Sequence, residues 1–190
     1  MTAESDSGPK PTERGVRTEA VVVFDRQQDL PGQPGPQPRT EAVVVFDRQQ
    51  DMTVDEGRWA GLMRSVLTEE SVATPWEVGL SFVAAEEMAA LNAQYRGIDR
   101  PTDVLAFGVD DGTVPRADQE PRLVGDVVVC PSAAASNAEA RGNSVESELA
   151  LLVVHGTLHL LGYDHIDDSD AVAMQGRERE LVARSMEGLR

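Results

Sequence analysis

The chain has 190 residues, 41% of them hydrophobic, which suits one domain with a tail better than two domains. Its net charge of −16 argues against binding that follows a nucleic-acid backbone without regard to sequence, although it still allows a local basic pocket. No apolar run approaches the ~20 residues that span a bilayer, and the polar start MTAESDSGPKPTERG is not a secretory signal.

The single cysteine, Cys130, cannot form an internal disulfide bond. Together with the polar start, it predicts a soluble protein of the reducing cytoplasm. Cys130 closes the apolar run VVVC and precedes a proline, so we expect a small core residue rather than a nucleophile.

An internal repeat occupies the first third of the chain. The segment RTEAVVVFDRQQD occurs at 17–29 and again, unchanged, at 39–51, with the spacer LPGQPGPQP between the copies. Its EAVVVF core is typical of a buried strand, and we expect one sheet position for the two copies. The second copy closes a shorter loop to the next helix, so 40–46 is the predicted strand. We expect 1–38 to be a mostly disordered extension with the spare copy and a Pro/Gly linker, and 39–190 to be the functional domain.

The remaining elements follow in a regular order. A capping-box pattern at Thr53–Glu56 predicts a helix through about Leu67, and a later helix starts near Asn143 with Glu146 at the capping position. Further patterns predict strands at 78–83, 102–109 and 125–130, and helices at 84–96, 132–141 and 168–187. The last two strands are joined without a helical pattern, so we expect them to pair antiparallel. The predicted fold is a single α/β domain with a mixed, mostly parallel four-stranded sheet and helices packed on it.

All three histidines of the chain lie in the stretch LLVVHGTLHLLGYDH, at 155, 159 and 165. His155 and His159 are one helical turn apart, so their imidazoles leave the same face of the helix. Gly162 allows a left-handed turn that returns His165 toward that face. Three imidazoles with an open position are typical of catalytic zinc, and we predict one Zn²⁺ ion on His155, His159 and His165. The alternative is that these are ordinary polar or core histidines.

The spacing HxxxHxxGxxH is that of the metzincin metalloproteases, with one departure. Those enzymes carry a glutamate after the first histidine as general base toward zinc-bound water, and this chain has Gly156. The base of a peptidase is therefore absent from its usual position, and we expect Gly156 to leave room beside a metal-bound water. Met174 invites comparison with the Met-turn of the same proteases, but its helical pattern favours core packing.

The motif HGTLHLLGYDH, with the upstream segments LNAQYRGIDRPTDVLAF and GDVVVCP, resembles the YbeY family of bacterial rRNA-maturation endoribonucleases. The likeness extends from about Thr40 to Leu181. It implies a mixed α/β fold, zinc on the three histidines and hydrolysis of single-stranded RNA. It also implies maturation of the 3′ end of the small-subunit rRNA and ribosome quality control, with the small ribosomal subunit as partner and without a membrane or DNA.

The resemblance assigns catalytic roles to Arg96, the arginine of the YR pair, and to His155. An arginine at the end of a helix could clamp a phosphate and stabilise developing charge. The alternative for Arg96 is a cation at the helix C-terminus paired with Asp99. Asp164 and Asp103 could orient a ligand imidazole. Turn formation is an equally good role for Asp164, and a structural role at a strand edge is the default for Asp103.

Ala106 departs from the family pattern TDVLSF, which has serine at that place, so any substrate contact of that hydroxyl is lost here. Three hypotheses remain open at this point. The protein is a metal-dependent endoribonuclease, a zinc hydrolase of the metallopeptidase type, or a non-catalytic ribosome-assembly factor with structural zinc. An open coordination position separates the third hypothesis from the first two, because structural zinc sites are closed.

Overall fold

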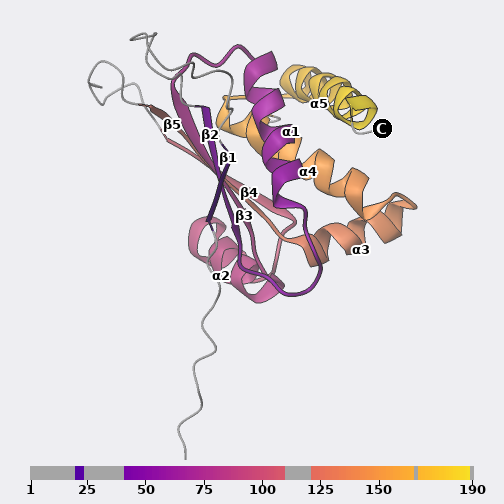
Figure 1. Ribbon diagram of the computed structural model, residues 1–190. Helices are drawn as coiled ribbons and strands as arrows, with labels where there is room; N and C mark the ends of the chain where they lie inside the picture. Colours follow the sequence, from indigo (N-terminus) through magenta and orange to yellow (C-terminus); the bar gives the residue numbers. More distant parts are fainter. Residues whose placement is uncertain (1–19, 24–40, 110–120, 165–166, 189–190) are drawn as a thin grey trace, which may run out of the picture.

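The structure, a computed structural model, describes residues 20–23, 41–109, 121–164 and 167–188. These residues form one sheet and a set of helices around it (Figure 1). In chain order the elements are β1 Ala20–Val23, β2 Glu41–Asp47, α1 Glu56–Glu69, β3 Trp76–Phe82, α2 Ala85–Arg96, β4 Val104–Gly108, β5 Arg122–Val129, α3 Pro131–Arg141, α4 Val145–Leu160 and α5 Asp168–Gly188.

The sheet has the strand order β1-β2-β3-β5-β4. β2 pairs parallel with β3, β3 pairs parallel with β5, and β4 pairs antiparallel with β5. These four strands confirm the predicted mixed, mostly parallel sheet. The antiparallel pairing of β4 with β5 follows the expectation for two strands joined without a helical pattern.

The two copies of the repeated segment lie side by side in the sheet. The second copy forms β2 next to β3, as predicted. Four residues of the first copy form β1, which pairs antiparallel with the other edge of β2, so that Ala20 is opposite Phe46 and Val23 is opposite Val43. This fifth strand was not predicted, because only one sheet position was expected for two copies. A second strand-forming segment satisfies the backbone donors and acceptors that the edge of β2 presents. The other residues of 1–38 lie outside the described residues, so their disorder stays a prediction.

Helices cover both faces of the sheet (Figure 1). α1 and α4 pack on one face, and α5 packs on α4 and α1. α2 belongs to the other face, where Met88 packs with Leu105 and Val128. Because successive strand residues face opposite sides of a sheet, Val127 joins the main core under α4 while Val128 joins the smaller core. Cys130 is buried in the smaller core, as predicted.

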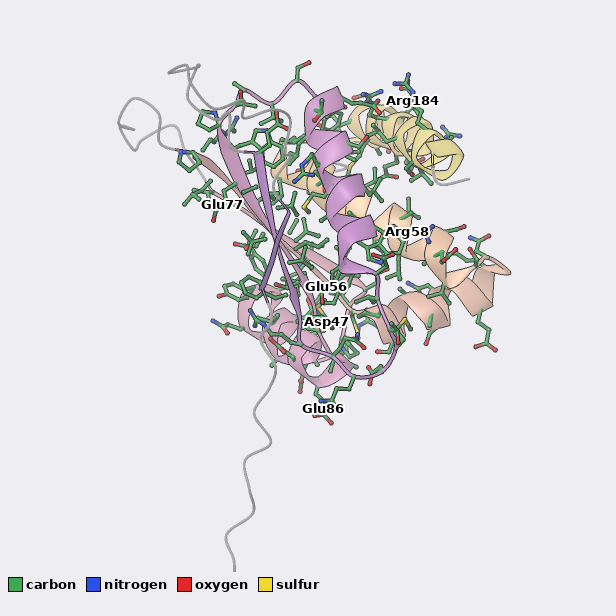
Figure 2. The ribbon with its side chains drawn as sticks, viewed as in Figure 1. Asp47, Glu56, Arg58, Glu77, Glu86 and Arg184 are labelled. Carbon is green, nitrogen blue, oxygen red and sulfur yellow. The ribbon has the colours of Figure 1, made fainter. Side chains whose placement is uncertain are left out.

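Two side chains at the start of α1 stabilise this helix, Asp55 through a cap and Arg58 through an ion pair. The carboxylate of Asp55 caps it by accepting a hydrogen bond from the Arg58 backbone N–H at 3.0 Å. The prediction that Thr53 is the cap was wrong, since Asp55 is the residue directly before the first helical turn. The side chain of Arg58, labelled in Figure 2, reaches α4. Its Nη1 lies 2.8 Å from Glu146 Oε1.

Gly142 and Ser144 separate α3 from α4. Gly142 adopts φ +70° and ends α3 at Arg141, the predicted last residue of this helix. Ser144 caps α4, because its Oγ accepts a hydrogen bond from the Ser147 N–H at 3.1 Å. The cap is therefore one residue after Asn143, where the helix was predicted to start, and Glu146 lies in the first turn, where it pairs with Arg58. Among the described residues, no helix is both long and apolar enough to cross a bilayer.

Candidate functional site

Two histidines of α4 form the centre of the candidate site. His155 and His159 project from the same face, with ring centroids 4.5 Å apart and ring planes at 83°. Their Nε2 atoms lie 3.1 Å from each other. Both side chains are partly buried. The prediction that the i, i+4 spacing brings these two imidazoles together is therefore confirmed.

The opposite nitrogen of each ring meets a hydrogen-bond acceptor. His155 Nδ1 lies 2.6 Å from Glu178 Oε1, and His159 Nδ1 lies 2.9 Å from the backbone carbonyl oxygen of Tyr163. A carbonyl or a carboxylate can only accept, so each Nδ1 carries a proton and donates it. This is how metal-binding histidines are commonly held, with Nε2 directed at the ion.

The donor set fits a zinc ion. Two nitrogens bound at 2.0–2.1 Å to one tetrahedral ion lie about 3.3 Å apart, close to the separation of His155 Nε2 and His159 Nε2. The third predicted ligand, His165, lies outside the described residues. Within the ranges that the structure describes, no group of three metal-binding side chains is present, so the complete ligand set stays a prediction.

The turn after α4 has the conformation predicted for it. Gly162 adopts φ +89°, a left-handed conformation that favours glycine. The Tyr163 N–H donates to the Leu158 carbonyl at 3.1 Å, and the Gly162 N–H donates to the His159 carbonyl at 3.1 Å. This turn brings the Tyr163 carbonyl back to the imidazole of His159. The turn thus ends the helix and orients one of the two site histidines.

Gly156 faces the sheet and not the site. A Cβ at this position would lie 2.5 Å from Val127 Cγ1 and 3.3 Å from Val104 Cγ2. The expectation that Gly156 leaves room beside a metal-bound water was therefore wrong. Glycine is required because α4 lies against β5 and β4 at this residue. A glutamate here, as in the metzincins, would collide with the sheet.

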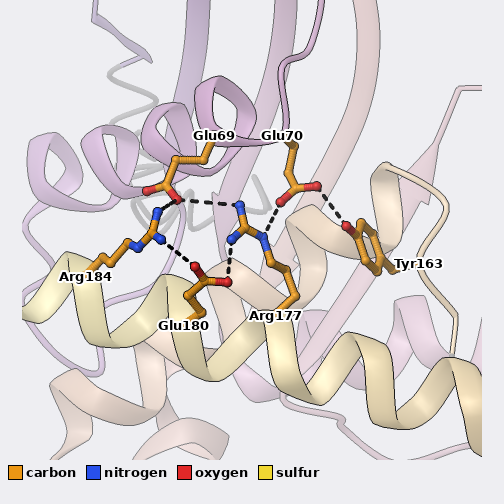
Figure 3. A network of polar contacts seen from close by, with 6 residues as sticks. All are labelled: Glu69, Glu70, Tyr163, Arg177, Glu180 and Arg184. Atoms are coloured by element: carbon orange, nitrogen blue, oxygen red, sulfur yellow. Dashed lines mark hydrogen bonds and ion pairs between the residues drawn. The ribbon is translucent and has the colours of Figure 1, made fainter.

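A polar network joins α1, α5 and the turn after α4 (Figure 3). Glu70 Oε2 accepts from the Tyr163 hydroxyl at 2.9 Å, and Glu70 Oε1 accepts from Arg177 Nε at 2.6 Å. Arg177 also bonds Glu180 at 2.7 Å. Arg184 Nη1 lies 2.7 Å from Glu69 Oε2, and Arg184 bonds Glu180 as well. The network fixes α5 and the Tyr163 turn to the end of α1.

The ionisation of the network groups reflects these contacts. Donation to the Glu70 carboxylate, with burial adding to it, raises the pKa of the Tyr163 hydroxyl above its usual value. The hydrogen bonds to Glu70 and Glu180 raise the pKa of Arg177 as well. The same arginine holds the pKa of Glu180 below its usual range. At neutral pH Tyr163 therefore stays an uncharged donor, while Arg177 stays positive and Glu180 negative.

Glu178 was missed in the sequence, although it contacts a predicted ligand. It lies 23 residues after His155, so no local motif joins the two. One signal was present: Met174, Glu178 and Leu181 share the i, i+4, i+7 face of α5, and all three are buried. A charged residue on an otherwise apolar helix stripe points to a specific buried partner. Met174 itself packs in the main core, as predicted.

Arg96 is the last residue of α2 and is exposed. Among the described residues it makes no hydrogen bond or ion pair, with Asp99 or with either site histidine. The loop that follows is anchored by the buried Asn92, whose Nδ2 donates to the Arg100 carbonyl at 2.7 Å. Arg96 is therefore exposed at the end of α2, and the structure does not bring it into contact with the two described histidines.

The other predicted site residues occupy different surroundings. The Asp103 carboxylate accepts from the Asn137 side chain and from the Val104 N–H, both at 2.9 Å. Within the described residues it bonds no histidine, so its contacts are those of a structural residue. Asp164 is exposed and lines a cavity of about 320 Å³ beside Tyr163. Ala106 packs against the main core from β4.

The fold and the converging imidazoles define a mixed α/β protein with a histidine site on a core helix. A family model described as Endoribonuclease YbeY matches residues 44–186. The chain belongs to the endoribonuclease YbeY family, which confirms the resemblance seen in the sequence.

Individual relatives agree with this assignment. Endoribonuclease YbeY of Macrococcus caseolyticus is 42% identical over 115 residues, covering 60% of this chain and 75% of that protein. Endoribonuclease YbeY of Pelotomaculum thermopropionicum is 40% identical over 136 residues, covering 70% and 90%. The solution structure of TM1509 from Thermotoga maritima matches with a TM-score of 0.52 and 29% identity, covering 72% of this chain and 87% of that one.

Proposed function

We propose that the protein is a zinc-dependent endoribonuclease that cleaves single-stranded RNA. The observation that carries this proposal is the pair of Nε2 atoms 3.1 Å apart, each on a ring whose Nδ1 is held by an acceptor, in a chain of the YbeY family. His155, His159 and His165 would hold the ion. The proposal includes maturation of the small-subunit rRNA 3′ end, ribosome quality control, the small ribosomal subunit as partner and a cytoplasmic location.

The residues of the site would divide the work of phosphodiester cleavage. Bound zinc would supply a hydroxide at neutral pH, because it lowers the pKa of its water to about 7. Glu178 and the Tyr163 carbonyl orient the two imidazoles. Arg96, exposed at the end of α2, would clamp a phosphate oxygen and stabilise the charge that develops on it.

The packing of Gly156 argues against the metallopeptidase alternative. The base of those enzymes sits beside the first histidine, and here that position is pressed against Val127. A peptidase in this fold would need a base from another element. RNA cleavage leaves a second route open, since the attacking group can be a ribose 2′-hydroxyl of the substrate itself.

A paired assay tests the proposed function. Purified, metal-loaded protein is incubated with a single-stranded RNA and, separately, with casein. We expect RNA cleavage without casein cleavage, and loss of RNA cleavage in His155→Ala. Arg179→Ala is a suitable control for purification, because Arg179 is exposed on α5 and, among the described residues, bonds only the Gln175 carbonyl of its own helix. Cleavage of casein alone, or equal RNA cleavage by His155→Ala, would overturn the proposal.

A further inference from the structure

Glu178 occupies an unusual place for a carboxylate. It lies on the buried face of α5, between Met174 and Leu181, and is 8% exposed. Burying a carboxylate is costly unless a specific partner compensates for it. Its close contact is His155 Nδ1, 2.6 Å from Oε1.

This contact determines which nitrogen of His155 is available to a ligand. A neutral imidazole carries one proton, and the hydrogen bond made by one nitrogen sets the role of the other. The Glu178 carboxylate can only accept, so the proton lies on Nδ1 and the lone pair lies on Nε2. That lone pair faces the Nε2 of His159.

The neighbouring arginine fixes the helix that carries this carboxylate. Arg177 bonds Glu70 at the end of α1, and Glu70 also accepts from the Tyr163 hydroxyl (Figure 3). The carbonyl of the same Tyr163 holds His159 Nδ1. One assembly of α1, α5 and the Tyr163 turn therefore orients both imidazoles.

We propose that Glu178 is a positioning residue that sets the tautomer and ring orientation of His155 for metal binding. The metal part of this inference rests on the proposed function, whereas the tautomer part does not. A positioning role differs from a structural one in its effect on stability. Methionine at 178 would continue the apolar stripe from Met174 to Leu181 at similar volume, so it should preserve the fold while removing the acceptor.

Nitrogen-15 NMR of the histidine side chains in metal-free protein, at a pH where they are neutral, reads the tautomer directly. In the wild type we expect the His155 proton on Nδ1. In Glu178→Met we expect it to move toward Nε2, with His159 unchanged. Zinc and cobalt affinities, measured by competition with a chelator, should fall about 10- to 100-fold in Glu178→Met, while the melting temperature stays the same or rises.

Two further variants make the result decisive. Glu178→Gln keeps the shape and a weaker acceptor, so we expect an intermediate loss of affinity, and it replaces Glu178→Met should that variant not fold. Arg179→Ala is the matched control, because Arg179 is exposed on the same helix and, within the described residues, bonds only the Gln175 carbonyl. An unchanged His155 tautomer with unchanged affinity overturns the inference, as does an equal loss in Arg179→Ala. A wild-type protein that binds no metal would contradict the proposed function. The comparison of the His155 tautomer between the wild type and Glu178→Met would still decide whether Glu178 is a positioning residue.

Discussion

Gly156 shows how packing against the sheet restricts the residue that follows a site histidine. Its α-carbon lies where α4 presses on β5, so the position after the first site histidine cannot carry a side chain. The same HxxxH spacing that places a general base in metalloproteases therefore serves here without one. The sequence indicated that the general base is absent from the position after the first histidine. The reason is the contact of this position with Val127, which is known only once the packing of α4 on the sheet is known.

Gly156→Ala should lower the melting temperature, because its Cβ would meet Val127 at 2.5 Å. Overpacking of this kind costs about 1–3 kcal/mol, against about 1 kcal/mol gained in helix propensity. Gly176→Ala is the control: Gly176 lies within α5 and an added Cβ meets no atom of the described residues within 4 Å, so stability should hold or increase. Thermal unfolding followed by circular dichroism compares the two. A destabilised Gly176→Ala beside an unaffected Gly156→Ala would contradict the packing described here.

Arg96→Ala should reduce RNA cleavage at least about tenfold with little change in melting temperature, since removing a donor to transition-state charge has large effects on rate. The exposed Arg96 makes no ion pair within the described part of the chain, so its loss should not disturb the fold. Initial rates on single-stranded RNA, with Arg179→Ala alongside, provide the measurement. Unchanged activity, or a collapse in stability, would make Arg96 a structural residue.

At the level of elements, the local sequence pattern predicted most strands of the sheet but missed the edge strand β1. Strand β3 follows from the alternation of apolar residues, β5 follows from an apolar run bounded by glycine and proline, and the end of α4 follows from Gly162. β1 was missed because a four-residue edge strand exists only through its pairing with β2, which is a tertiary contact. Glu178 was missed for the same kind of reason, since its partner lies on another helix.

The repeated segment allows a matched pair of proline substitutions. Val44 and Val22 have the same neighbours in sequence, but Val44 lies in β2, paired on both sides, whereas Val22 lies in the edge strand β1. Val44→Pro should destabilise the protein by about 1–3 kcal/mol, because a ladder hydrogen bond is lost inside the sheet. Val22→Pro should have a smaller effect, since prolines are tolerated on edge strands. Chemical denaturation measures both. Greater damage from Val22→Pro would mean that the first copy occupies the inner position.

At the level of the whole molecule, one face of the sheet carries the candidate site and the other carries α2, which ends at Arg96. The paired imidazoles, the turn at Gly162 and the family were predictable, because they depend on short spacings within one segment. The contacts by which Glu70, Arg177 and Glu178 hold that segment in place could not be predicted, because they join three elements that only the fold brings together. A site predicted from local spacing is thus held by contacts that are distant in sequence.

The metal content of the purified protein tests most directly the claim that α4 and its following turn hold one metal ion. The full chain is purified without a His-tag and without a chelator, and its transition metals are quantified per chain by elemental analysis. Because three imidazoles form a complete set of protein ligands for a catalytic ion, we expect about one equivalent, mostly zinc. A content below about a tenth of an equivalent of any transition metal would contradict the claim. A site with three histidine ligands should stay nearly filled during purification without a chelator.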